Sequence, residues 1–173
     1  MNGKKYSGKG FDEKGKILYE IENGNGFVRE YNNDGELVFK GQYINGKRNG
    51  KGWEFKGKFL IYEGEYLNGK RNGKGKEYSE FGDMDFEEED IIQTGEENIH
   101  TEKIFEGEYS NGKRWNGNGK EIDNQETIIF EGEYFEGKKW NGRGKEWIIE
   151  DDIFGAKKNL IEYEYSNGVK KEI

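Results

Sequence analysis

The stretch Tyr62-Glu-Gly-Glu-Tyr-Leu-Asn-Gly-Lys-Arg-Asn-Gly-Lys-Gly-Lys-Glu-Tyr78 decides the fold, because edited copies of it recur along the chain. Four clear copies occupy residues 40–52, 63–75, 106–119 and 131–144. A unit this short cannot bury a core alone, so it is stable only when neighbouring units stack on it. We therefore expect function to reside on a surface that several units build together.

Each copy has the pattern of a β-hairpin. In the first half, Tyr62, Gly64 and Tyr66 alternate with glutamates, which places rings and carboxylates on opposite faces of a strand. Asn68-Gly69 then predicts a tight reversal, because both residues accept the positive φ that such a turn requires. A lone hairpin is marginal in water, so adjacent hairpins should join into one sheet.

A loop from Asn68 to Arg71 would fix the pairing of the two strands. On the charged face this register pairs Glu65 with Lys74 and Glu63 with Lys76; on the other it pairs Tyr66 with Gly73 and Gly64 with Gly75. Glycine leaves room for a ring to lie flat on the backbone. The sequence thus predicts an all-β fold: an elongated, single-layer, twisted antiparallel sheet of tandem β-hairpins.

Composition sets further limits. Only 31% of the 173 residues are hydrophobic and 37% are charged, but aromatic residues reach 15% and stand at fixed repeat positions, which favours a thin folded structure. The chain has no cysteine, no apolar signal segment and no stretch of membrane-spanning length. A soluble, cytoplasmic protein is the expectation.

The net charge of -8 comes from one segment. Residues 82–102 contain nine acids and no Lys or Arg, leaving 27 acidic and 28 basic residues elsewhere. We interpret 82–102 as an acidic insertion between repeats of a single array that spans 1–173. A degenerate hairpin or ordered loop, an acidic interaction loop and plain disorder all remain open for it.

The last two clear copies carry one extra residue after the turn, Trp115 or Trp140. One added residue in a hairpin predicts a bulge or a longer loop, with the tryptophan at the hairpin tip.

The repeated string resembles the MORN repeat (membrane occupation and recognition nexus) over about residues 16–149, with longer links and Tyr where Trp is frequent. The resemblance implies a sheet whose aromatic face forms a groove. It also implies a scaffold that binds a helix or extended segment of a protein partner, or a second copy as a homodimer. Lipid binding is a further property proposed for the family. Variant repeats of this kind make an antitoxin or immunity-type protein another alternative.

Catalysis is not expected. The pattern Gly-x-x-x-x-Gly-Lys, as at Gly64 to Lys70, resembles a phosphate-binding loop, but Arg71 follows where Ser or Thr is needed. His100 is the only histidine, so the sequence predicts neither a His-paired triad nor a His-rich metal site. We expect no enzyme activity, no catalytic residues, no cofactor and no metal.

The aromatic face is the first candidate binding surface, since a one-layer sheet cannot cover its own apolar side. The expected partner-binding residues are Tyr43, Tyr66, Tyr109, Tyr134, Trp53, Trp115, Trp140 and Trp147. In the alternative interpretation, the rings pack only on each other and on glycines.

The hairpin tips are the second candidate. They carry basic residues that would line one edge of the sheet and attract anionic lipid: Lys47, Arg48, Lys70, Arg71, Lys113, Arg114, Lys138 and Lys139. The alternative is a solvated rim. The acidic chain as a whole argues against nucleic acid as a partner.

Overall fold

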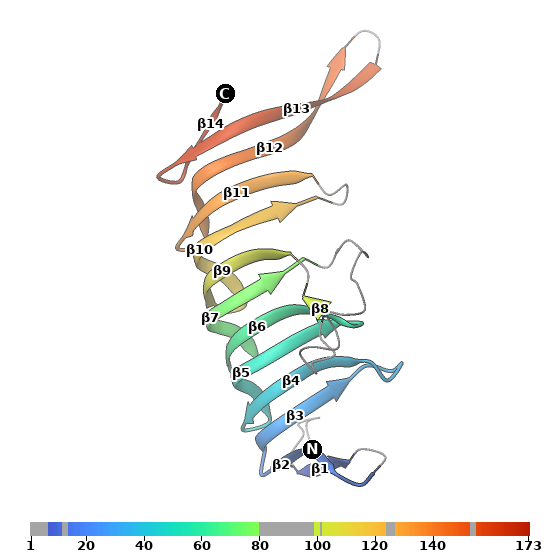
Figure 1. Ribbon diagram of the computed structural model, residues 1–173. Coiled ribbons are helices and arrows are strands. Elements are labelled where there is room, and N and C mark those ends of the chain that lie inside the picture. Colours follow the sequence, from blue (N-terminus) through green and yellow to red (C-terminus); the bar gives the residue numbers. More distant parts are fainter. Residues whose placement is uncertain (1–6, 12–13, 80–98, 101, 124–126, 153–154) are drawn as a thin grey trace.

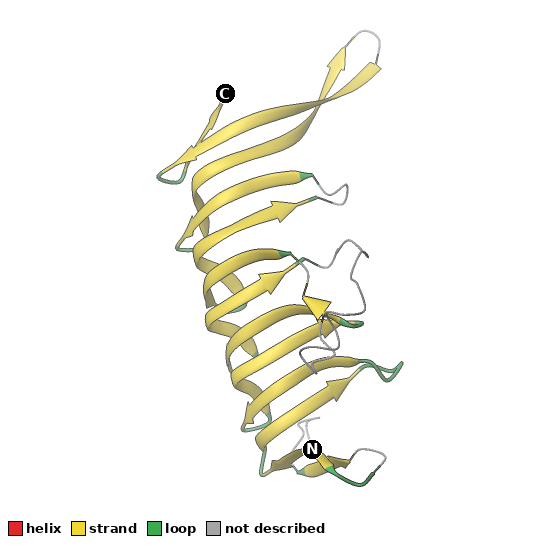
Figure 2. Ribbon diagram, viewed as in Figure 1, coloured by secondary structure: helices red, strands yellow, loops and turns green. Residues whose placement is uncertain are grey.

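The computed structural model describes residues 7–11, 14–79, 99–100, 102–123, 127–152 and 155–173, and these form one open, twisted sheet with no helix (Figures 1 and 2). Thirteen of the described strands follow one another as antiparallel neighbours in the order β1-β2-β3-β4-β5-β6-β7-β9-β10-β11-β12-β13-β14. The short strand β8 pairs in parallel with β6. The predicted fold is confirmed.

The strands have the following bounds: β1 (Gly8–Phe11), β2 (Ile17–Glu22), β3 (Asn25–Tyr31), β4 (Leu37–Ile44), β5 (Lys47–Lys56), β6 (Phe59–Leu67), β7 (Lys70–Tyr78), β8 (Ile99–His100), β9 (Lys103–Ser110), β10 (Lys113–Ile122), β11 (Ile128–Phe135), β12 (Lys138–Asp152), β13 (Gly155–Ser166) and β14 (Val169–Glu172).

Two-residue turns close the repeat hairpins at one edge of the sheet. Asn68 and Gly69 have φ of 53° and 91°, as the Asn-Gly signal predicts, and Asn45 and Asn111 have similar values. Each turn also bonds to the preceding hairpin: the amide N–H of Gly69 donates to the carbonyl of Arg48 at 2.8 Å. The turn edge is therefore hydrogen-bonded from repeat to repeat.

A bulge follows the turn and resets the register in the four hairpins β4–β5, β6–β7, β9–β10 and β11–β12. In the hairpin β6–β7, Glu63 pairs with Lys76 and Gly64 with Gly75, as predicted. The predicted pairing of Tyr66 with Gly73 is wrong, because the turn contains only two residues and Tyr66 lies opposite Arg71. Gly73 sits in the bulge, at a φ of +93° that favours glycine. Its register partner is Tyr109 of the next hairpin.

The bulge makes each strand curl around its ring-bearing side. Tyr62 and Tyr66 are four residues apart, which is about 13 Å in an extended strand. Their ring centroids are nevertheless only 5.5 Å apart. Phe105–Tyr109 and Phe130–Tyr134 repeat this geometry at 5.2 and 5.4 Å. The ring face is therefore concave, and we name it the inner face; the face that carries Glu63 and Lys76 is the outer face.

The core is one continuous row of edge-to-face rings along the inner face. Contacts within a strand alternate with contacts between repeats, such as Phe39–Tyr66 at 5.3 Å and Tyr62–Tyr109 at 5.1 Å. The buried members are Ile21, Val28, Phe39, Tyr43, Tyr62, Tyr66, Phe105, Tyr109, Phe130 and Tyr134.

The glycines leave space for these rings, as predicted. A Cβ on Gly75 would lie 2.4 Å from the hydroxyl oxygen of Tyr62, and one on Gly52 would lie 2.7 Å from the ring of Phe39. A methyl group at either position would displace a core ring.

The acidic insertion 82–102 lies mostly outside the described residues. Of its residues the structure describes Ile99, His100 and Glu102, and β8 (Ile99–His100) pairs with Phe59 and Leu60 of β6. Strands β7 and β9, which flank the insertion in sequence, are direct neighbours in the sheet.

Candidate functional site: the inner groove

The four predicted tyrosines lie at equivalent places in the core. Tyr43, Tyr66, Tyr109 and Tyr134 are only 7, 3, 4 and 8% exposed. Each hydroxyl donates a hydrogen bond to a glutamate of the preceding hairpin, as in Tyr66 to Glu54 at 2.7 Å and Tyr109 to Glu77 at 2.9 Å. The rings pack on one another and on glycines, so they are not a free contact surface in this conformation.

This environment disfavours the ionised tyrosines. Burial raises the pKa of Tyr43 to about 12, and the hydrogen bond to Glu30 adds to the effect. The pKa of Tyr66 is raised further by burial and by the charge of Glu54.

The arginines of the predicted basic stripe turn inward over the rings. The guanidinium carbons of Arg48 and Arg71 lie 4.0 and 4.1 Å from the ring centroids of Phe39 and Tyr62. Arg114 stacks at 4.9 Å over Phe105, and the ammonium of Lys139 lies 4.9 Å from the Phe130 centroid. These four cations therefore cover the core and do not extend from the hairpin tips.

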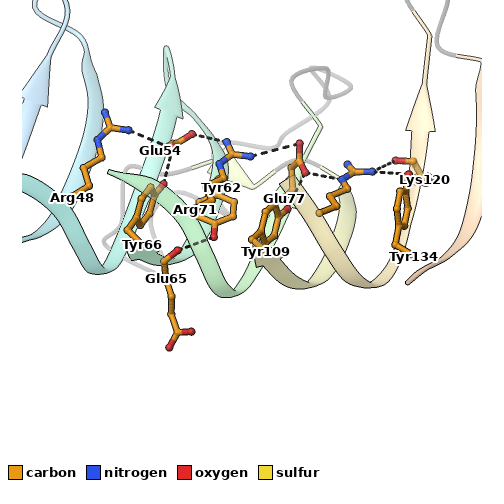
Figure 3. A network of polar contacts seen from close by, with 11 residues as sticks. Arg48, Glu54, Tyr62, Glu65, Tyr66, Arg71, Glu77, Tyr109, Lys120 and Tyr134 are labelled. Carbon is orange, nitrogen blue, oxygen red and sulfur yellow. Dashed lines mark hydrogen bonds and ion pairs between the residues drawn. The ribbon is translucent and has the colours of Figure 1, made fainter. Parts of the chain in front are cut away.

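Carboxylates link the three arginines into a chain along the sheet (Figure 3). Glu54 accepts hydrogen bonds from Arg71 at 2.5 Å and Arg48 at 3.4 Å, besides that from Tyr66. Glu77 accepts from Arg114 at 2.9 Å and lies 3.8 Å from Arg71. We call the set Glu30, Arg48, Glu54, Arg71, Glu77 and Arg114 the inner ladder.

Neighbouring cations lower the pKa of two partly buried glutamates, Glu54 of the inner ladder and Glu121 near its end. Burial would raise the pKa of Glu54, but the hydrogen bond and charge of Arg71 outweigh it, with help from Tyr66 and Arg48, so the net pKa is lowered. Lys139 and Tyr134 lower the pKa of Glu121 in the same way against the effect of burial. Both glutamates stay charged, so Glu54 remains paired with Arg71 and Glu121 with Lys139.

The predicted tryptophans do not share one surface. Trp115 and Trp140 are bulge residues, as predicted, and their rings lie against the next turns at Gly137 and Gly168. Trp53 packs on the outer-face cluster of Phe55, Leu60 and Tyr78. Trp147 is 38% exposed on β12, with its indole N–H 3.3 Å from Asp123.

An open groove runs beside the ladder at the strand ends remote from the turns. It has a volume of about 480 Å³ and spans strands β6 to β11. Its apolar lining includes Ile61, Ile104 and Ile129, each the residue just before a core ring and each skipped by the strand register. Its polar lining includes Arg71, Glu77, Arg114, Lys120 and Glu121. We call this the inner groove.

Sequence reasoning missed the isoleucines. Their signal was present, since an aliphatic residue precedes the aligned aromatic in four repeats: Val38, Ile61, Ile104 and Ile129. Strict alternation would assign them to the outer face, and only the register shift brings them beside the ladder.

Four lysines of the predicted basic stripe do lie at the turn edge. Lys47, Lys70, Lys113 and Lys138 are exposed, and within the described part of the chain none of them forms an ion pair. Three of them lie opposite an exposed apolar residue: Ile44, Leu67 and Phe135 respectively for Lys47, Lys70 and Lys138.

These features define a class of protein: a single-layer sheet of tandem hairpins with a self-packed aromatic interior. The family model for the MORN repeat matches residues 39–57, 62–83 and 105–123, and these three matches support the assignment of the chain as a MORN repeat protein. Repeats of this family are binding modules, generally associated with proteins or membranes. A comparison with curated proteins gave no match.

The described residues contain no helix that could cross a membrane. They also contain no group of three or more His, Cys, Asp or Glu side chains arranged to hold a metal.

Proposed function

We propose that this protein is a non-enzymatic scaffold or adaptor whose inner groove receives a helix or extended segment of a protein partner. The observation that supports it best is the groove itself: about 480 Å³, with aliphatic side chains next to paired charges. Aliphatic contacts supply affinity when they are buried, while the charged rim selects the partner's orientation.

The supporting contact residues differ from the tyrosines expected first. Tyr66 and Tyr109 hold the core together, so replacing them would measure stability and not binding. Ile61 and Ile104 are partly exposed and line the groove, which makes them the appropriate positions to change.

The test uses affinity capture from the native source with three forms of the full chain. These are the wild type, Ile61→Glu with Ile104→Glu, and the control Val169→Glu, which adds one carboxylate at a 67% exposed position on β14. A partner retained by the wild type and the control but lost by the double variant supports the groove, provided that circular dichroism shows the same melt. Equal capture by all three forms refutes it.

A second candidate function, peripheral binding to anionic membranes, is favoured by the turn edge. Each exposed lysine near a lipid surface contributes about 1 kcal/mol, so the four would supply about 4 kcal/mol. Ile44, Leu67 and Phe135 could insert beside them. Flotation with phosphatidylserine vesicles at physiological salt tests this, with Lys70→Glu and Lys113→Glu expected to abolish flotation. Wild-type protein that stays at the bottom of the gradient rules it out.

A further inference from the structure

Two cations face each other on the outer face, remote from the inner groove. Arg29 of β3 lies directly opposite Lys40 of β4. Their sequence neighbours Val28 and Phe39 are fully buried in the inner core, so Arg29 and Lys40 point outward. Like charges directly opposite on adjacent strands destabilise a sheet. Elsewhere the outer face pairs opposite charges, as in Lys9–Glu20 at 2.7 Å and Lys76–Glu63 at 3.5 Å.

Neither charge has an acidic partner among the residues that the structure describes. The Nε atom of Arg29 is buried and makes no hydrogen bond, the one such side-chain atom among the described residues. The ammonium of Lys40 lies 5.5 and 5.4 Å from the rings of Trp53 and Phe55. Within the described part of the chain, no carboxylate pairs with either cation. A buried hydrogen-bond donor without an acceptor lowers stability, so the presence of the unpaired Nε–H of Arg29 calls for an explanation.

The surroundings suit a peptide. Phe27 and Tyr31 flank Arg29 on the same face of β3 and are 40 and 45% exposed. On the other side, Trp53 lines an outer groove of about 570 Å³ that continues across β5, β6, β7 and β9. Its floor is glycine backbone, formed by Gly52, Gly64, Gly75 and Gly107. Side chains are absent from that floor, so another main chain can approach it closely.

We propose that Arg29 and Lys40 bind a carboxylate of an extended acidic segment of a protein partner, whose chain continues into the outer groove. Adjacent strands are about 4.8 Å apart, so the two oxygens of one carboxylate can bridge the guanidinium and the ammonium. Binding would relieve the repulsion between the two cations. The site lies on the opposite face from the inner groove and goes beyond the proposed function.

The observations favour a peptide over a nucleic acid. A polyanion needs several phosphate contacts, and it meets long-range repulsion from a chain of net charge -8. The outer groove itself is lined by Glu63, Glu65, Glu106 and Glu108 as well as by Lys51, Lys74 and Lys76. One or two carboxylates can bind here at short range, whereas a row of phosphates would meet these acids.

The test measures fluorescence anisotropy with the full chain and labelled nine-residue peptides that alternate Glu and Val, with a Gln-for-Glu peptide and a thymidine oligonucleotide as comparisons. The Glu peptide should bind at least tenfold more tightly than the Gln peptide. Arg29→Met with Lys40→Met should weaken it at least tenfold, while Lys113→Met with Lys138→Met, the same charge change at the turn edge, should not. The Arg29/Lys40 variant should also melt no lower than the wild type, because it loses a like-charge pair. No binding of the Glu peptide, equal binding by the Arg29/Lys40 variant, or preference for the oligonucleotide overturns the proposal.

Discussion

Replacing Arg71 with alanine should lower the free energy of unfolding by about 3 kcal/mol. The guanidinium stacks on Tyr62 at 4.1 Å, an interaction of about 1 kcal/mol in a partly desolvated site. Its hydrogen bond to Glu54 is charge-assisted and contributes about 1.5–3 kcal/mol. The side chains of Arg71 and Glu54 are 20 and 18% exposed, so solvent screens their interaction in part. The expected loss therefore lies in the lower part of the range that the two contributions add up to.

Urea denaturation followed by far-ultraviolet circular dichroism measures this loss. Lys70→Ala is the matched control, since Lys70 is the preceding residue, is exposed and has no ion pair in the described structure; its effect should stay within about 0.5 kcal/mol. Arg71→Lys should give an intermediate loss of stability. A lysine ammonium can pair with Glu54, but it cannot reproduce the planar stacking of the guanidinium on Tyr62 or its forked hydrogen-bond geometry. A double-mutant cycle with Glu54→Gln should reveal a coupling of about 1–2 kcal/mol. Equal stability of Arg71→Ala and Lys70→Ala would refute the ladder as a stabilising element.

Three further outcomes follow from the same core. Gly75→Ala should cost about 1–3 kcal/mol because its methyl group meets Tyr62, whereas Gly8→Ala, with open space around it, should be neutral; equal melting temperatures would contradict this. Because the pKa of Glu54 is lowered in the folded state, its stabilising contribution is complete above the ordinary pKa of 4.5 and is lost as the pH falls below that value. The urea midpoint should therefore drop between about pH 5 and 3, and a midpoint that does not change with pH would contradict this. The raised pKa of Tyr66 gives the opposite dependence, with stability lost as pH rises beyond 10.0. The tyrosinate absorbance of the buried tyrosines should therefore appear only together with unfolding; early, reversible ionisation of every tyrosine would argue against a buried row.

The positions of the turns and the pairing of the glycines were predictable because the local sequence determines them. Asn68-Gly69 needs only its own backbone preferences to make the turn, and Gly64 opposite Gly75 follows from residue counting. The curl of the strand was not predictable in this way. Strict alternation keeps Tyr62 and Tyr66 about 13 Å apart, where each ring would stay accessible. The bulge at Gly73 brings them together and buries them, which turns an expected contact surface into a core.

Whether a basic residue after a turn stays outside or points inward over the rings depends on a difference of one position in the strand register. Lys70 lies opposite Leu67 and remains outside, while Arg71 lies opposite Tyr66 and points inward over the rings. Residue type alone does not separate two adjacent cations after a turn. Counting outward from a two-residue turn would have separated them, because directly opposed residues share a face.

The two proposed surfaces use the two sides of the same strands. On β6, Ile61 lines the inner groove while Glu63 and Glu65 line the outer groove. A single-layer sheet separates the two grooves by its own thickness only, yet no residue lines both of them. If both proposals hold, the acidic peptide and the inner-groove partner should bind at the same time, so saturating peptide should leave capture of the partner unchanged. Competition between them would mean that one surface serves both ligands, or that binding on one face changes the strand curl that shapes the other.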